Sequence, residues 1–158
     1  MKIIGIDPGL SSTGIGIVRG TGIRIDGFSY GSVDTSKSMT LPARLKKIYT
    51  KIASLLESEN PDLMVIEDIF SLQKYPKSGI VLGQVSGVIL LAAEQIGVRA
   101  REVPVREAKQ VLTGNGNASK IQLEKSVRHQ LKLTSPIRPL HASDALGLAL
   151  IGLYRHGC

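Results

Sequence analysis

Two short apolar runs, each ending on an acidic residue, stand far apart in the chain. Residues 3–6 precede Asp7, and residues 63–66 precede Glu67. Runs of this length are typical of buried strands. If the two strands are parallel neighbours, both carboxylates lie at one edge of a sheet, where ligand sites of open α/β folds are found. Asp7 alone is equally compatible with an ordinary Asp-Pro-Gly turn, so the prediction depends on the pair. Close carboxylates repel each other, which predicts a cation between them.

Alternation of apolar and polar positions predicts that three strands open the chain. After the strand that ends at Asp7, residues 13–19 and 23–30 both have period-2 patterning. Residues 20–22 (Gly-Thr-Gly) between them indicate a hairpin turn. We therefore expect an antiparallel meander, followed by a polar loop over residues 32–39.

Helical periodicity begins after that loop. Apolar residues over 41–55 recur at helical spacing, with Thr40 as a possible N-cap, and the helix is expected to end before Asn60. Residues 62–67 then form the fourth strand and residues 97–103 a shorter fifth strand. The order of elements predicts an α/β fold.

An apolar helix is predicted over residues 78–95, and it carries Gly79, Gly83 and Gly87 at four-residue spacing. Glycine costs a helix roughly 1 kcal/mol relative to alanine. A stripe of small residues allows another backbone to approach closely. Either the sheet or a second subunit would satisfy this pattern.

A glycine-rich connection separates the next two predicted helices. The first ends at Leu112, and Asn117 is the expected N-cap of the second. Lys109 and Lys120 flank the connection, a layout suited to phosphate contacts through side chains and free backbone amides. A simple helix connection with solvated lysines is the alternative.

The last predicted helix runs from near Leu140 to Tyr154 and is almost entirely apolar. His141 and Asp144 are three residues apart, so they share one face of its first turns. Taken alone, His141 favours a cap or a core histidine. A buried carboxylate such as Asp144 is costly unless it is paired or binds a metal.

Length and charge narrow the function further. The 158 residues fit one domain, residues 1–158. Residues 99–138 hold 9 of the 20 basic residues but only 3 of the 13 acidic ones, which favours a polyanionic partner. Cys158 is the single cysteine, so a cytoplasmic protein without an intrachain disulfide is expected. We expect no membrane association, because the N-terminus lacks a signal-peptide layout and no uninterrupted apolar run approaches about 18 residues.

Five segments in this order resemble the RuvC Holliday junction resolvases of the ribonuclease H-like superfamily. The resemblance covers essentially the whole chain and implies a ribonuclease H-like fold, with a five-stranded mixed sheet and helices on both faces. The segments that carry it are GIDPG (5–9), IEDIF (66–70), LGQVSGV (82–88), KQVLTGNGNASK (109–120) and SDALGLAL (143–150).

The resemblance also implies a catalytic metal site. Asp7, Glu67 and Asp144 match the family's metal-binding carboxylates, and His141 falls where many members have a fourth acidic ligand and a minority have histidine. The implied cofactor is Mg²⁺, two ions per active site, with Asp7 as the expected bridging ligand and Mn²⁺ as a substitute. An imidazole ligand is softer than a carboxylate, which makes Mn²⁺ relatively more acceptable.

The remaining implied residues concern DNA and partners. Phe70 matches the aromatic residue that stacks into the opened junction, while Lys109 and Lys120 match basic residues of the DNA-binding face. The glycine-bearing helix resembles the family's dimer-forming helix. The implied partners are four-way junction DNA, a second copy of the chain, and branch-migration proteins of the same pathway.

Three other functions compete with this interpretation. A related nuclease of the same fold that processes structured ribosomal RNA precursors starts with a similar strand, but the glycine helix and Phe70 argue against it. An actin-like ATPase needs two such domains, for which the chain is too short. A junction-binding protein without catalysis would result if His141 has spoiled the metal site.

Overall fold

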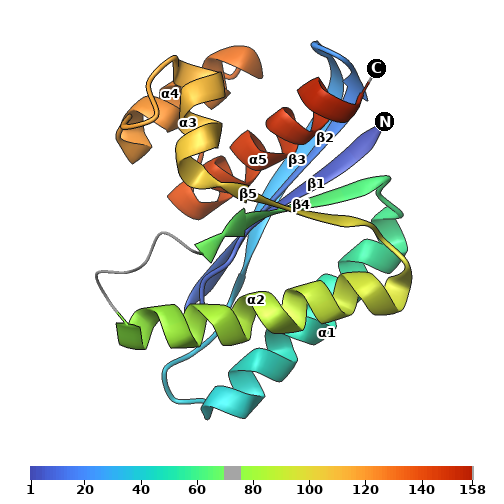
Figure 1. Ribbon diagram of the computed structural model, residues 1–158, viewed down its shortest axis with the longest axis vertical. Helices are drawn as coiled ribbons and strands as arrows, with labels where there is room; N and C mark the ends of the chain where they lie inside the picture. Colours follow the sequence, from blue (N-terminus) through green and yellow to red (C-terminus); the bar gives the residue numbers. More distant parts are fainter. Residues whose placement is uncertain (70–75, 158) are drawn as a thin grey trace.

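The computed structural model describes residues 1–69 and 76–157. Its centre is a five-stranded mixed sheet in the order β3-β2-β1-β4-β5 (Figure 1). β1 pairs antiparallel with β2 and parallel with β4, β2 pairs antiparallel with β3, and β4 pairs parallel with β5. The strands are β1 Lys2–Asp7, β2 Ser12–Thr21, β3 Arg24–Asp34, β4 Leu63–Asp68 and β5 Ala100–Pro104.

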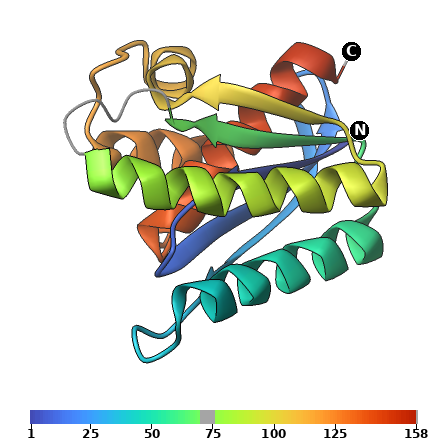
Figure 2. The same cartoon turned by 60° about the horizontal axis from the view of Figure 1, so that its bottom comes forward.

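Helices cover both faces of this sheet, as predicted. Within residues 1–69 and 76–157, two helices pack on one face and three on the other (Figures 1 and 2). The first pair is α1 Leu41–Glu59 and α2 Pro76–Ile96, and the second group is α3 Val105–Thr113, α4 Lys120–Gln130 and α5 Leu140–His156.

Because side chains alternate between the two faces of a strand, β1 contributes apolar side chains to two separate clusters. Ile3 belongs to the apolar cluster under α5, while Ile4 and Ile6 belong to the cluster under α1 and α2. Side chains of successive strand residues point to opposite faces, so Gly5 faces α5. A Cβ atom at Gly5 would lie 1.9 Å from the Ala145 carbonyl oxygen. The lack of a side chain there allows α5 to lie directly on the sheet.

The end of β3 and the N-cap of α4 differ from the sequence prediction. β3 extends to Asp34 and shortens the expected loop over 32–39, because β3 pairs along the whole of β2, with Asp34 opposite Ser12. The N-cap of α4 is Ser119 and not Asn117. Its hydroxyl accepts a hydrogen bond from the Gln122 N–H, and the Gln122 side chain accepts one from the Ser119 N–H, forming a capping box.

Helix α2 has one packed side and one open side. Its buried residues, such as Val85 and Ile89, join the core shared with α1, whereas Ile80 is 65% and Leu91 51% exposed. Polar residues interrupt the stretch Lys77–Ile96, so it is not a continuous apolar run. By length and composition only, this stretch is long and apolar enough to cross a membrane. Core helices of soluble proteins have the same property.

Among the described residues, no atom lies within 4 Å of a Cβ built at Gly87. At Gly83 the nearest such atom is Ile69 Cδ1, at the ordinary contact distance of 3.7 Å. Within the described part of the chain, therefore, no backbone approaches α2 closely at Gly83 or Gly87. A second subunit is the alternative that the sequence left open.

Candidate metal centre

The parallel pairing of β1 and β4 brings two acidic residues to one edge of the sheet. Ile6 of β1 lies opposite Ile66 of β4, so the next residues, Asp7 and Glu67, are neighbours at the carboxyl ends of both strands. Asp7 is only 5% exposed and lies on the central strand of the sheet. The predicted juxtaposition of these two carboxylates is confirmed.

Helix α5 brings two further side chains to the same edge. A Cβ atom at Gly14 of β2 would lie 2.0 Å from the His141 carbonyl oxygen, so glycine is needed where the first turn of α5 meets the sheet. His141 Nδ1 lies 2.6 Å from Asp7 Oδ2. One ligand atom from each of Asp7, His141 and Asp144 can be chosen so that all three lie within 4.8 Å of one another, close enough to hold one metal ion.

Lys120 also reaches the cluster, as the first residue of α4. Its Nζ lies 3.2 Å from Asp144 Oδ2, and its side chain lines the cavity that contains Asp7 and Glu67. The sequence predicted a cation between the acids and, separately, placed Lys120 on a DNA-binding face. Only the fold brings this ammonium group to the carboxylates.

Burial and the closeness of the acidic side chains raise the pKa values of two of them. Burial, followed by a hydrogen bond with Asp7 and the charges of Asp7 and Asp144, raises the pKa of Glu67 from 4.5 to about 9. Burial and the charge of Asp7 also raise the pKa of Asp144. Glu67 is therefore protonated at neutral pH when no cation other than Lys120 is bound. A divalent cation would allow the carboxylates to ionise together.

The basic groups respond to the same negative charge. The hydrogen bond with Asp7 raises the pKa of His141. Burial by itself would lower the pKa of Lys120, but Asp144 and Asp7 together raise it. The negative charge of the acidic side chains thus favours the protonated form of both basic groups.

A cavity of about 280 Å³ opens beside these groups. Carboxylate oxygens are the ligands that Mg²⁺ prefers, and imidazole nitrogen is accepted by Mn²⁺ and other transition metals. The donor set therefore fits a divalent cation. The cavity is lined by Asp7, Pro8, Gly9, Glu67, Ile69, Leu82, Lys120 and His141.

The glycine-rich connection between α3 and α4 is ordered internally. The Gln110 side chain accepts from the Gly116 N–H and donates to the Gly114 carbonyl oxygen, both at 3.0 Å. The Asn115 amide donates to the Thr113 hydroxyl at the end of α3, and the Asn117 amide donates to the Asn115 side-chain oxygen. The expectation of free amides for phosphate is therefore wrong for these positions, because side chains of α3 and of the connection already accept their hydrogen bonds.

Of the other two predicted DNA-binding residues, Lys109 is among the described residues and Phe70 is not. Lys109 lies half-buried on α3, and its contact with DNA stays a prediction. Phe70 lies outside the described residues.

Glu124 is a buried residue that the sequence analysis did not single out. Its Oε1 accepts a hydrogen bond of 2.9 Å from the Ile137 N–H and lies 3.4 Å from Arg128 Nε. These contacts tie α4 to the segment that enters α5, and hence to His141. The four-residue spacing of Glu124 and Arg128, which places both on one helix face, is the sequence signal that could have identified this pair.

Comparison with known proteins points to one family. A sequence model described as crossover junction endodeoxyribonuclease RuvC matches residues 3–152. The RuvC crossover junction endodeoxyribonuclease of Brevibacillus brevis is 39% identical over 150 residues, covering 95% of this chain and 90% of that protein. The corresponding protein of Rhodopirellula baltica is 37% identical over 152 residues, covering 96% and 85%.

A solved structure, Thermus thermophilus RuvC in complex with a Holliday junction substrate, matches with a TM-score of 0.90 at 29% identity. The match covers 98% of this chain and 94% of that chain. The ribonuclease H-like fold and the resemblance found in the sequence are confirmed.

Proposed function

Because the chain belongs to the RuvC family of crossover junction endodeoxyribonucleases, we propose that it resolves Holliday junctions during recombination and DNA repair. The reaction is hydrolysis of phosphodiester bonds in two strands of like polarity. The observation that carries this proposal is the convergence of Asp7, His141 and Asp144 within 4.8 Å at the sheet edge, next to Glu67. We take residues 1–158 as one nuclease domain, acting in the cytoplasm.

Asp7, Glu67, His141 and Asp144 are the proposed metal ligands, with Mg²⁺ as the cofactor and Mn²⁺ as a substitute. Two bound metal ions would supply an activated water and stabilise the leaving 3′ oxygen. Asp7 lies on the central strand between Glu67 and the α5 residues, which supports its role as the ligand shared by both ions. His141 must present a neutral imidazole, since the protonated ring has no lone pair to offer.

Lys120 has a second role in this proposal. In the absence of metal its ammonium group pairs with Asp144. Once divalent cations balance the carboxylates, this exposed lysine is free to contact a phosphate of the bound strand. Lys109 and the basic residues around it supply further phosphate contacts without reading sequence.

We propose that the working form is a homodimer. A two-fold dimer presents two active sites to two strands of like polarity, which accounts for paired, symmetric cuts. Ile80, Gly87 and Leu91 of α2 are spaced seven and four residues apart, so they share one helix face. On that face the apolar side chains of Ile80 and Leu91 are exposed, and no described atom lies near a Cβ at Gly87. Branch-migration proteins of the same pathway are the further proposed partners.

The test is cleavage of an end-labelled synthetic four-way junction with Mg²⁺, with Mn²⁺ and with chelator, alongside Asp7→Asn. Paired, symmetric cuts that require metal and Asp7 are expected. Tight binding of the junction without cutting in either metal would indicate a junction-binding protein instead. Preferential cutting of structured RNA would indicate the related RNA-processing nuclease.

A further inference from the structure

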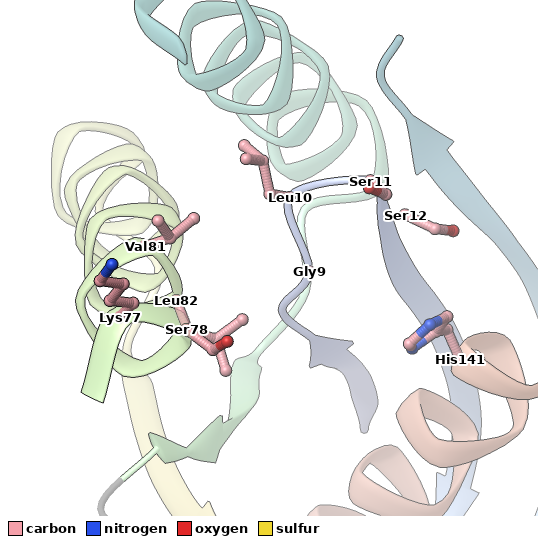
Figure 3. A pocket seen from close by; sticks show the side chains of 9 residues that line it. All are labelled: Gly9, Leu10, Ser11, Ser12, Lys77, Ser78, Val81, Leu82 and His141. Carbon is pink, nitrogen blue, oxygen red and sulfur yellow. The ribbon is translucent and has the colours of Figure 1, made fainter. Parts of the chain in front are cut away.

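A second cavity adjoins the candidate metal centre. It has a volume of about 500 Å³ and lies between the turn that joins β1 to β2 and the first turns of α2 (Figure 3). Gly9, Leu82 and His141 line both this cavity and the smaller one that holds the acidic residues. The two spaces are therefore neighbours that meet at His141, and a ligand bound at the metal centre can extend into the larger one.

The walls of the larger cavity combine three kinds of group. Leu10 on the turn and Val81 on α2 supply apolar surface (Figure 3). Ser12 and Ser78 supply hydroxyl groups, and Lys77 supplies a positive charge. None of these residues belongs to the acidic cluster. Apolar walls with a few polar groups are typical of sites for small organic groups of this size.

A deoxynucleotide has matching chemistry. The faces of its base are apolar and its edges form hydrogen bonds, while its phosphate is an anion. We infer that this cavity binds the deoxynucleotide next to the scissile phosphate in the strand being cut, with the base between Leu10 and Val81 and its outer phosphate on Lys77. The inference rests on the proposed nuclease function. Because the strand is continuous, a nucleotide attached to the scissile phosphate must occupy space that adjoins the metal centre.

Single-phosphate neutralisation tests the contact with Lys77. A series of junctions is prepared, each with a single methylphosphonate at a different position around the cut. Each junction is then incubated with the parent protein, with Lys77→Ala and with Lys51→Ala, which changes an exposed lysine of α1. We expect Lys77→Ala to cut the unmodified junction severalfold more slowly than the parent. At one flanking position, the methylphosphonate should slow the parent severalfold but leave Lys77→Ala unaffected. Lys51→Ala should match the parent at every position.

A blocking substitution tests the cavity itself. Ser78→Tyr places a large side chain at the cavity wall, and Ser54→Tyr makes the same change at an exposed position of α1. We expect Ser78→Tyr to lose at least about tenfold in kcat/KM for cleavage, with Mn²⁺ binding measured by calorimetry unchanged. Ser54→Tyr should retain parental cleavage.

Two results would overturn the inference while leaving the proposed function intact. One is a Lys77→Ala protein that keeps the parent's sensitivity at every methylphosphonate position. The other is a Ser78→Tyr protein that cuts as fast as Ser54→Tyr. Failure of the parent to cut the unmodified junction would instead overturn the proposed function, and the inference with it.

Discussion

His141 Nδ1 lies 2.6 Å from Asp7 Oδ2, although the two residues are 134 positions apart in the chain. The contact joins the first turn of α5 to the end of the central strand. It connects the protonation of an imidazole to the carboxylate proposed to be shared by both metal ions. Several measurable properties depend on this pair and its neighbours.

The first prediction concerns pH and metal preference. The hydrogen bond with Asp7 raises the pKa of His141, and a protonated imidazole cannot bind metal. Cleavage should therefore fall by about tenfold per pH unit below that pKa. In His141→Asp the acid limb should move to lower pH and the ratio of Mn²⁺ to Mg²⁺ rates should decrease. Rate profiles of both proteins in each metal check this; identical profiles would remove His141 from the ligand set.

The second prediction concerns stability without metal. Glu67 has a pKa near 4.5 when unfolded and about 9 when folded, so between these values the folded state binds more protons. Stability must then fall as pH rises through this range, and the raised pKa values of His141 and Asp144 act in the same direction. We expect the melting temperature in chelator to drop by several degrees between pH 6 and pH 8.5, at about 2 to 4 °C per kcal/mol.

Glu67→Gln is the control for this pH dependence. It removes the ionising group while keeping the shape of the side chain, so its melting temperature should change less with pH. Mg²⁺ should stabilise the parent more at pH 8.5 than at pH 6, because the carboxylates must lose protons to bind it. A slope that is the same in Glu67→Gln and the parent would contradict the assignment.

The third prediction concerns Glu124. Glu124→Ala leaves the Ile137 N–H without its acceptor and Arg128 without its carboxylate, which should cost about 1 to 3 kcal/mol of unfolding free energy. Glu124→Gln should lose less, since the amide oxygen can still accept from Ile137. Glu57→Ala, at an exposed position of α1, serves as the control in urea unfolding. Equal losses at positions 57 and 124 would show that the buried contacts contribute little.

The fourth prediction concerns assembly through α2. Ile80→Lys introduces a charge on the open apolar face of α2 and should shift the protein from dimer to monomer in analytical ultracentrifugation. Paired cuts should give way to single nicks, because one active site would act at a time. Ile23→Lys, at an 87% exposed position in the turn between β2 and β3, should remain dimeric. A dimer that survives Ile80→Lys would argue against this face.

Much of the fold and the acidic site could be read from the sequence because the signals are local. Period-2 alternation marks the strands, and an apolar run that ends on Asp7 or Glu67 marks a sheet edge whatever the rest of the chain does. The i to i+3 spacing of His141 and Asp144 likewise places both on one helix face. These features need only backbone geometry and the burial of apolar side chains.

Features of the site that depend on contacts between residues distant in the sequence were decided only by the tertiary structure. The pairing of Lys120 with Asp144, and the raised pKa of Glu67, follow from burial and from charges brought together by packing α4 and α5 on the sheet. The amides of Asn115, Gly116 and Asn117 in the glycine-rich loop proved to be occupied, because side chains of Thr113 and Gln110 on α3 and of Asn115 accept their hydrogen bonds. The cavity beside His141 exists only between the β1–β2 turn and α2, and no local pattern specifies the space between two elements.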